Sequence, residues 1–397
     1  MTCFYKSLSI AMLFLVAACS QPQLRLAPVD EIEADESVVV DDQELVVLVG
    51  STDAAVWLDT QTYARGYRLK TQEPLGGLGT IMMVFKLPEG LEGARAIGEV
   101  ERLEPGATAG VNHRYTYQAD PRTPEEIQQE AVYRRTYASR LIGWPAAGCP
   151  AQLPVGIIDA SIDLDALVFQ RARITQKQFS SRPSQKEDWH GTAVAELLVG
   201  SGRLNNAKLY SASVISHDVR GQASAGVSDI LRALDWLVSE GVRIVNISLA
   251  GPYNKILDQG IQFAAKQGLI IVAAAGNGGP QSTQKFPAAF PEVIAVTAVD
   301  ARGAIYNKAV QGDHIDIAAP GVDVFVAGSG DGRYITGTSF AAPFVTAQLA
   351  ATVNPNNLPS LEGARESLSA SSRDLGPTGH DDTFGAGLFR HSACVDF

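Results

Sequence analysis

Three residues of types that support nucleophilic catalysis stand beside short apolar runs in this 397-residue chain. Asp159 ends "VGIID", His190 opens "HGTAVAELL" and Ser339 follows "YITGT". His190 would take the proton of Ser339 and return it to a leaving amine, because imidazole titrates near neutral pH. Asp159 would hold the ring in one tautomer and stabilise the imidazolium. Each residue also has an ordinary alternative role, since aspartates form turns and serines cap helices.

The elements around these residues predict an α/β fold with a parallel sheet and helices on both faces. Continuous apolar runs of strand length alternate with helical patterns from residue 154 onward. The expected strands are "PVGIID", "KLYSASV", "RIVNISL", "LIIVAAAG" and "VIAVTAVD". Fully apolar strands separated by helices are typical of such sheets. Ligands bind beyond the carboxyl ends of the strands, so functional side chains are expected just after the apolar runs.

The local sequences resemble those of one enzyme family, the subtilisin-like serine proteases or subtilases. "HGTAVA" and "GTSFAAP" are similar to the family's histidine and serine motifs, and "VGIID" to the strand before its aspartate. Further similar segments are "NISLAGP", "AAAGNGGP", "FPAAFPEVIAVTAVD", "DIAAPG" and "FGAGL". The order Asp, His, Ser is that of subtilisin. The resemblance spans about residues 150–390 and implies a subtilisin-like catalytic domain over residues 146–397. It implies a serine endopeptidase that forms an acyl-enzyme intermediate.

The resemblance also assigns residues that bind substrate. Asn277 would be an oxyanion donor beside the helix that begins near Ser339, whose N–H groups and dipole favour developing negative charge. An extended peptide substrate would pair as an added strand with Ser248, Leu249 and Ala250, and it would lie between them and the opposing segment "RGQASAG". Another set of small residues would line the specificity pocket and so admit large apolar or aromatic side chains: Ala274, Ala275 and Gly276.

Several positions depart from the family pattern. Ala160 and Ser161 follow the aspartate where Ser or Thr and then Gly are usual, which predicts a strained turn at Ser161. Ala193 stands in place of a second histidine and Glu196 in place of a glycine. Ala250 replaces glycine and would crowd the substrate strand. These changes bear on rate and specificity more than on reaction type.

Two other function classes compete with the endopeptidase. A pseudoprotease lipoprotein that binds peptides without cutting them is supported by the altered "DAS" turn at Asp159. A fluorophosphonate probe would label Ser339 in the enzyme alone. A lipase or esterase is disfavoured, because its G-x-S-x-G elbow follows a strand and its serine comes first in the triad order.

The N-terminus predicts export. Residues 1–18 carry Lys6 and then an apolar stretch too short to span a bilayer, which is typical of a signal peptide. "LVAAC" resembles the lipobox of bacterial lipoproteins, which implies lipidation at Cys19 and a periplasmic or outer-membrane location. The lipid would be the only membrane anchor, and release of the protein after processing is the alternative location. An ordinary signal with an incidental cysteine is the alternative. Residues 19–43 are acidic and predict a solvated tether.

Residues 44–120 predict a small α+β domain in the order strand, helix, strand, strand, helix, strand. This order resembles the ferredoxin-like propeptides of the family, which chaperone folding and then inhibit the enzyme. "HRYTYQ" would be the inhibitory strand, with cleavage near Tyr117 or Gln118. A permanent accessory domain is the alternative. A linker helix is expected within residues 121–145, with Thr123 as cap and Pro124 in its first turn.

Charge and cysteines limit the partners. The net charge of −11 argues against nucleic acid and says nothing more about the substrate. Protein or peptide substrates are what the resemblance to the subtilases implies. A disulfide between Cys149 and Cys394 is predicted for the exported chain, with two free thiols as the alternative. No metal or cofactor is expected. His314 lies in "GDHID", which predicts a loop before a strand, and no calcium ligand set is evident.

Overall fold

The computed structural model describes residues 41–117, 120–121, 131–180, 189–217, 223–330 and 332–395. The predicted signal peptide, the lipidation site Cys19 and nearly all of the acidic tether lie outside the described residues. No helix in the described part of the chain combines the length and the apolar character needed to cross a membrane.

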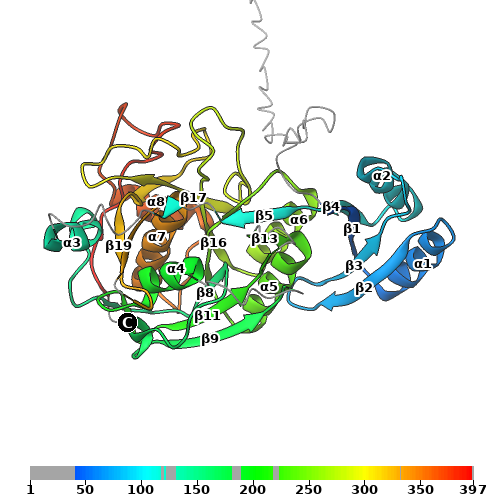
Figure 1. Cartoon of the computed structure of the whole chain (residues 1–397), viewed down its shortest axis with the longest axis horizontal. Helices are drawn as coiled ribbons and strands as arrows, with labels where there is room; N and C mark the ends of the chain where they lie inside the picture. The colour runs from blue at the N-terminus through cyan, green and yellow to red at the C-terminus, as the bar shows by residue number, and fades with distance from the viewer. Residues whose placement is uncertain are drawn as a thin grey trace, which may run out of the picture. The chain divides into compact units, whose positions relative to one another are not determined.

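An antiparallel sheet with two helices forms the N-terminal domain, in the predicted order of elements (Figure 1). Its elements are β1 (Asp41–Val49), α1 (Thr52–Tyr63), β2 (Arg68–Leu75), β3 (Thr80–Lys86), α2 (Gly93–Leu103) and β4 (Thr108–Asn112). The strand order β2-β3-β1-β4 is that of a split βαβ unit, as in ferredoxin-like folds. Ser51 begins α1 as a cap, its side chain accepting a hydrogen bond from the Ala54 N–H.

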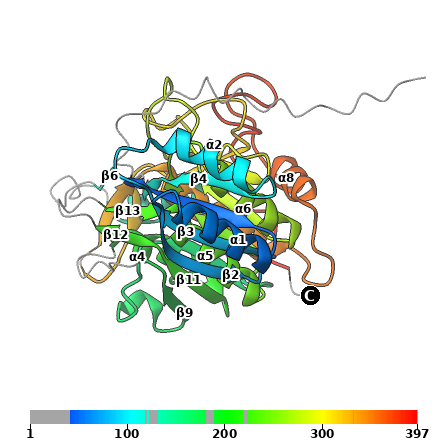
Figure 2. The same ribbon diagram turned by 90° about the vertical axis from the view of Figure 1, so that its right-hand side faces the viewer.

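The two faces of this sheet bury two different apolar sets, because side chains alternate along a strand. Leu45, Val47 and Phe85 belong to a core that also contains residues of α1 and α2. Val46 and Leu48 belong instead to a core shared with α5 (Val227–Ser239) and α6 (Lys255–Lys266). Figure 2 shows α1 and α2 on the outer side of the N-terminal sheet, with α5 and α6 behind it.

A seven-stranded sheet forms the centre of the second domain, and its neighbouring strands are parallel. Its order is β18-β17-β16-β14-β8-β11-β9. The bounds are β8 (Val155–Asp159), β9 (Arg173–Gln178), β11 (Lys208–Ser213), β14 (Ile244–Ile247), β16 (Ile270–Ala274), β17 (Val293–Val299) and β18 (Ile317–Pro320). The predicted parallel sheet is confirmed, including the five expected strands.

Helices cover both faces of this sheet, also as predicted. On one face lie α4 (Trp189–Val199) and α7 (Thr338–Thr352), which share a core with Ile157 and Val272. On the other face lie α5 and α6, which share a core with Ile158 and Val245. Side chains that alternate along β8 and its neighbouring strands therefore belong to two apolar cores, one on each face of the sheet. The helix α8 (Leu361–Ala370) follows α7 and begins at the cap Ser360.

Short strands complete the fold near the ends of the sheet. They are β5 (Arg114–Tyr117), β6 (Asp120–Pro121), β7 (Cys149–Pro150), β10 (Leu204–Asn205), β12 (Ile215–His217), β13 (Ala223–Gly226), β15 (Leu249–Ala250), β19 (Val324–Val326) and β20 (Arg333–Thr336). A single 3₁₀ turn covers Leu167–Phe169.

The predicted linker helix over residues 121–145 differs in part from the structure. The helix α3 (Ala131–Ile142) ends before Gly143, which has a φ of +75° and suits a helix end. Asp120 and Pro121 instead form β6, because their backbone pairs with β20. Residues 122–130, with the predicted cap Thr123, lie outside the described part.

Candidate active site

Two of the three predicted catalytic residues are in direct contact. Asp159 is the last residue of β8, and His190 is the second residue of α4. His190 Nδ1 lies 2.6 Å from Asp159 Oδ1, and both side chains are buried. A carboxylate accepts hydrogen bonds, so Nδ1 carries the proton and Nε2 presents its lone pair. The Ala160 N–H also donates to Asp159 Oδ1 at 2.6 Å, which fixes the carboxylate.

The start of α7 lies against His190. The His190 ring is 5.2 Å from the ring of Phe340, the residue that follows Ser339. Trp189 packs on the same phenylalanine with a ring separation of 6.2 Å. The aromatic contacts therefore bring the N-terminal ends of α4 and α7 together, which carry His190 and Ser339.

Ser339 is held by the segment that follows β14. Its Oγ donates to the carbonyl oxygen of Ser248 at 3.3 Å, and the Ser248 hydroxyl donates to the Ser339 carbonyl at 2.8 Å. Pro343 has no N–H, so the Ser339 carbonyl lacks the helical donor that a residue four positions later normally supplies. Ser248 supplies that missing hydrogen bond. Sequence reasoning assigned Ser248 to the substrate strand and missed this second contact.

Gly337 allows the chain to enter α7 directly from β20. Its φ and ψ are both 156°, a conformation that is essentially restricted to glycine. Thr338 and Ser339 then form the first turn of α7. The N–H groups of this turn lack helical partners, so negative charge is favoured beside Ser339.

Asn277 lies beside this first turn. Its Oδ1 accepts from the Thr338 N–H at 3.1 Å and from the Thr338 hydroxyl at 2.9 Å. Because a backbone N–H can only donate, these bonds fix the orientation of the amide and turn its NH₂ group away from Thr338. The Thr338 hydroxyl also accepts from the Gly276 N–H at 3.0 Å. The role of Thr338 escaped the sequence analysis because its side chain acts through contacts with a distant loop.

The residues predicted to bind a substrate strand are paired with the chain's own β5. Leu249 lies opposite Tyr117 and Ala250 opposite Thr116, in antiparallel register. On its other edge β5 pairs with β13, where Ala225 lies opposite Tyr115. The four strands follow the order β12-β13-β5-β15. The backbone of the N-terminal domain thus continues into a strand held between the two predicted substrate-binding segments. Residues 220–222 of "RGQASAG" lie outside the described part.

The predicted pocket residues lie at the end of β16. Ala274 ends the strand, Ala275 follows it, and both are buried. Gly276 has a φ of +103°, and a Cβ there would lie 3.0 Å from Lys285 Cγ, so glycine is required. The lining of a specificity pocket by these three residues stays a prediction.

The departures from the family pattern are accommodated without the expected strain. Ser161 is not among the described non-glycine residues with positive φ, so the strained turn predicted there is wrong. Its hydroxyl lies 2.9 Å from Ser213 Oγ. The expected crowding at Ala250 does not prevent its pairing with Thr116. Glu196 accepts from the N–H groups of Ala327 and Gly328 at 2.7 and 2.8 Å, and burial raises its pKa.

One group of the described residues has the composition of a metal site, but it is a disulfide. Cys149 and Cys394 are bonded to each other across 245 residues of sequence. His391 Nε2 lies 3.5 Å from Cys149 Sγ and 3.7 Å from Cys394 Sγ. The two sulfurs are bonded to each other, so neither is a free thiolate that could bind a cation. Burial lowers the pKa of His314, and nearby Asp313 opposes that shift.

Comparisons with known proteins place this geometry in a family. Residues 152–387 match the sequence model of the subtilase family. Subtilisin DY of Bacillus licheniformis is 32% identical over 262 residues, which cover 62% of this chain and 91% of that protein. The minor extracellular protease Epr of Bacillus subtilis is 27% identical over 267 residues, covering 63% of this chain and 39% of Epr.

A solved structure agrees with the fold over most of the chain. Fervidolysin from Fervidobacterium pennivorans, described as a keratinolytic enzyme related to subtilisin, matches with a TM-score of 0.71 and 17% identity. The match covers 90% of this chain and 61% of fervidolysin. The chain therefore spans less than two thirds of the length of both Epr and fervidolysin. With more than half of its length matched by the family model, this chain belongs to the subtilase family.

Proposed function

We propose that this chain is an exported serine endopeptidase that acts through Asp159, His190 and Ser339. One observation carries the proposal above the others. The chain's own β5 lies as an antiparallel strand between β13 and β15, in the position that an extended peptide substrate would take. It ends at Tyr117, opposite Leu249, the residue after the one that contacts Ser339.

The chemistry follows from the contacts of the three residues. Ser339 Oγ attacks the carbonyl carbon of the scissile bond while His190 Nε2 takes its proton. Asp159 keeps Nδ1 protonated and stabilises the imidazolium through the 2.6 Å contact. The oxyanion receives hydrogen bonds from the first turn of α7 and from the amide of Asn277. The imidazolium then protonates the leaving amine, and water hydrolyses the acyl-enzyme by the reverse sequence of transfers.

The N-terminal domain acts in this proposal as an intramolecular chaperone and inhibitor. Tyr117 ends β5 opposite Leu249, and the neighbour of Leu249 is Ser248, whose carbonyl accepts from Ser339 Oγ. The chain then pairs with β20 from Asp120 onward. We therefore place the maturation cut after Gln118, within the region that the sequence predicted. A parallel sheet rich in non-local contacts profits from a domain that templates its folding.

The remaining proposals concern the location of the protein. A lipid on Cys19 would anchor the chain to the outer membrane, facing the periplasm, with protein or peptide substrates. The proposed cut lies downstream of Cys19, so the catalytic domain would be held only through its contacts with the N-terminal domain. A membrane fraction that contained active enzyme as full-length chain alone would contradict this retention.

Fluorophosphonate labelling tests the catalytic proposal. Purified protein should react at Ser339, and Ser339→Ala should abolish labelling. The wild-type chain should also yield a shorter fragment whose first residue is Ala119, whereas Ser339→Ala should stay full length. Intact, unlabelled wild-type protein that still bound peptides would support the pseudoprotease instead.

A further inference from the structure

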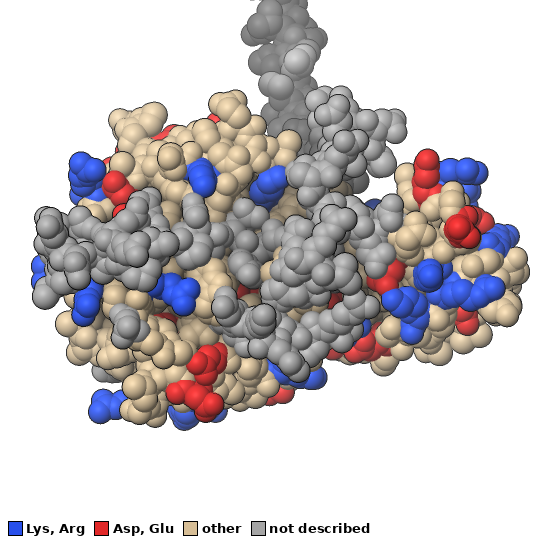
Figure 3. Space-filling model, viewed as in Figure 1, with Lys and Arg blue, Asp and Glu red and all other residues tan. Residues whose placement is uncertain are grey.

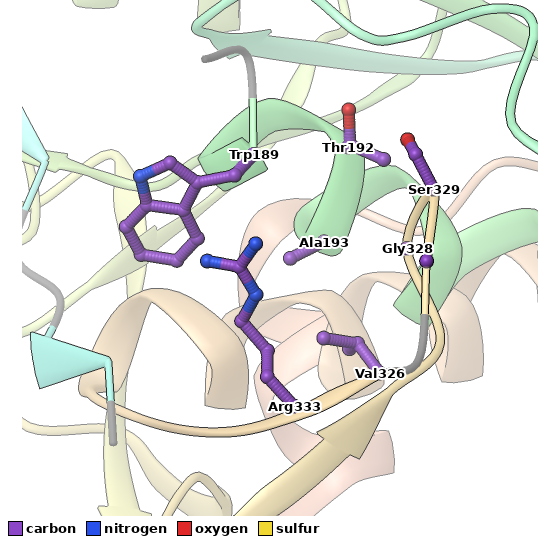
Figure 4. A pocket seen from close by; sticks show the side chains of 8 residues that line it. Trp189, Thr192, Ala193, Val326, Gly328, Ser329 and Arg333 are labelled. Atoms are coloured by element: carbon purple, nitrogen blue, oxygen red, sulfur yellow. The ribbon is translucent and has the colours of Figure 1, made fainter. Parts of the chain in front are cut away.

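A cavity of about 210 Å³ lies beside the candidate active site, between α4 and the hairpin of β19 and β20 (Figure 4). Residues of both elements line it: Trp189, Thr192, Ala193, Val326, Ser329 and Arg333. Trp189 directly precedes His190, so the cavity begins one residue from the proposed general base. A side chain of a substrate bound at the candidate active site could therefore reach this cavity.

Apolar walls and one cation give the cavity its chemistry. The Arg333 guanidinium lies 5.4 Å from the centre of the Trp189 ring, and Figure 4 shows the side chain extending toward that ring. Val326 and Ala193 supply apolar surface. Within the described part of the chain, Arg333 has no ion pair. A side chain with an apolar stem and a carboxylate end would match both features, because guanidinium binds carboxylate through two parallel N–H groups.

Glu196 holds the rim of the cavity in place. Its carboxylate accepts from the N–H groups of Ala327 and Gly328, the residues between β19 and the cavity-lining Ser329. On the outer side of the rim, the Ser329 hydroxyl donates to Asp163. The loop is therefore tied to α4 on one side and to the segment after β8 on the other. A preformed site of this kind loses little conformational entropy on binding.

Strand register shows which substrate residue faces the cavity. Val326 lies opposite Arg333 and Val324 opposite Ile335, so these four side chains project from one face of the hairpin. That face packs toward α4 and lines the cavity. On the other edge of β20, position 121 lies opposite Ile335. A substrate residue at this register projects onto the cavity side, and it is the third residue after the proposed cut.

We infer that Arg333 and Trp189 form a specificity site on the leaving-group side, which selects a glutamate at the third position after the scissile bond. The inference rests on the proposed endopeptidase function. The chain's own residue at that register is Pro121, which lacks a carboxylate, and none of the described residues before α3 forms an ion pair with Arg333. Substrates with glutamate there would compete better for the site than the chain's own segment does.

Internally quenched peptides test the inference on protein purified after expression of the full chain. The peptides are identical except for Glu, Gln or Lys at the third position after the cut. Wild type should cut the Glu peptide about three- to fivefold faster than the Gln peptide in kcat/KM, the range of a partly exposed ion pair. The ratio should fall toward one at about 1 M salt, where the charges are screened. Arg333→Gln should remove the preference, and Arg333→Glu should favour the Lys peptide.

Arg135 offers a matched control. Its guanidinium stacks on Phe325, 4.8 Å from the ring centre, on the opposite face of the same hairpin. Arg135→Gln should keep the wild-type preference. Equal cleavage of the Glu and Gln peptides by unlabelled enzyme, where a separate aliquot of the same preparation reacts with fluorophosphonate at Ser339, would overturn the specificity site alone. Cleavage of no peptide, together with absent labelling, would overturn the proposed function and this inference with it.

Discussion

Asn246 shows why a polar residue interrupts an otherwise apolar strand. It is fully buried in β14, and its Nδ2 donates to Ser248 Oγ at 2.8 Å. Thr346 of α7 donates to Asn246 Oδ1 at 3.2 Å. Ser248 in turn donates to the Ser339 carbonyl. A continuous chain of hydrogen bonds therefore joins the sheet to the first turn of α7, and buried polar groups are stable only when they are paired in this way.

Thr338 is expected to position Asn277 rather than to touch substrate. Thr338→Val keeps the shape of the side chain but removes hydrogen bonds to Asn277 and Gly276. We expect kcat to fall about ten- to a hundredfold with KM nearly unchanged, because the proposed oxyanion donor Asn277 then keeps its hydrogen bond from the Thr338 N–H but loses the one from the Thr338 hydroxyl. Steady-state kinetics on one peptide measures both constants, and Thr338→Ser should restore most of the rate. A proportional rise of KM in the valine variant would contradict a positioning role.

The individual residues differ in how far the sequence could predict them. Asp159 and His190 were predictable because strand ends and local motifs mark them, and the structure joins them directly. The strain expected at Ser161 was wrong because residue identity alone does not fix φ there. The hydrogen bond from Ser248 to Ser339 required knowledge of which carbonyl Pro343 leaves without a donor. Such information exists only once the helix start and the sheet are placed together.

Among the elements, β5 is held in position by backbone pairing with strands on both of its edges. Its four residues pair with β13 on one side and β15 on the other. At its entry, Asn254 Nδ2 donates to the Val111 carbonyl at 2.7 Å and contacts His113 Nδ1 at 2.9 Å. Asn254 Oδ1 meanwhile caps α6, which fixes the amide orientation. His113 Nδ1 must therefore accept, so the neutral ring is the form that fits.

Acid is expected to weaken the contact between Asn254 and His113, and with it the attachment of the chain at the start of β5. Burial lowers the pKa of His113 below its usual 6.5, so its neutral form stabilises the contact above that pH. The stabilisation is lost as the pH falls through the lowered pKa, because protonation sets an N–H against the Asn254 amide. In a Ser339→Ala background, amide hydrogen exchange of residues 111–117, after correction for the intrinsic pH dependence of exchange, should accelerate as the pH falls below about 6.5.

The variant His113→Asn keeps a hydrogen-bonding side chain but does not titrate in this range, so it should flatten the pH dependence. His380 is exposed, and His380→Asn serves as the matched control that should leave the dependence intact. Exchange in the His113→Asn variant that accelerated with acid as much as in the parent would show that other groups cause the loosening.

At the level of elements, the sequence predicted the interior of the central sheet better than its edges. The five expected strands are present, and β18 at one edge follows "GDHID", the loop predicted to precede a strand, but β9 at the other edge was not predicted. β9 is polar and mostly exposed, so it carries little of the apolar signal that marks a buried strand. β6 was not predicted, because its pairing with β20 is a long-range contact that local patterns do not contain.

Across the whole molecule, the N-terminal domain and the catalytic domain share one apolar core and several polar contacts. Val46 and Met82 pack in the same core as Leu231 and Ile261. The Leu78 N–H donates to Asp235 of α5 at 3.1 Å. The predicted α+β architecture was accessible from local periodicity, whereas this shared core was not. On the face shown in Figure 3, the described acidic and basic side chains are interspersed over both domains.

The disulfide joins the beginning of the predicted catalytic domain, residues 146–397, to its end, which makes it a global restraint. Cys149 lies in β7, which pairs with β10, and Cys394 lies in the C-terminal segment. That segment also donates the His391 N–H to the Ile142 carbonyl at 2.7 Å, and the His391 ring packs on Trp144 at 4.8 Å. Noncovalent contacts thus hold part of the segment, and the covalent bond restricts the unfolded chain.

Removing this restraint should lower stability without changing the site. The double variant Cys149→Ala/Cys394→Ala opens a loop that spans 245 residues, and a disulfide of this kind contributes about 2–4 kcal/mol by limiting the unfolded ensemble. We expect the Tm to fall by about 4–16 °C for a domain of this size. The comparison is made in the Ser339→Ala background, so that self-cleavage does not distort the unfolding curve. Dithiothreitol should lower the Tm of the parent and leave that of the double variant unchanged. Equal Tm values for parent and double variant under oxidising conditions would mean that the noncovalent contacts of His391 already hold the C-terminal segment, and that the covalent bond adds nothing to them.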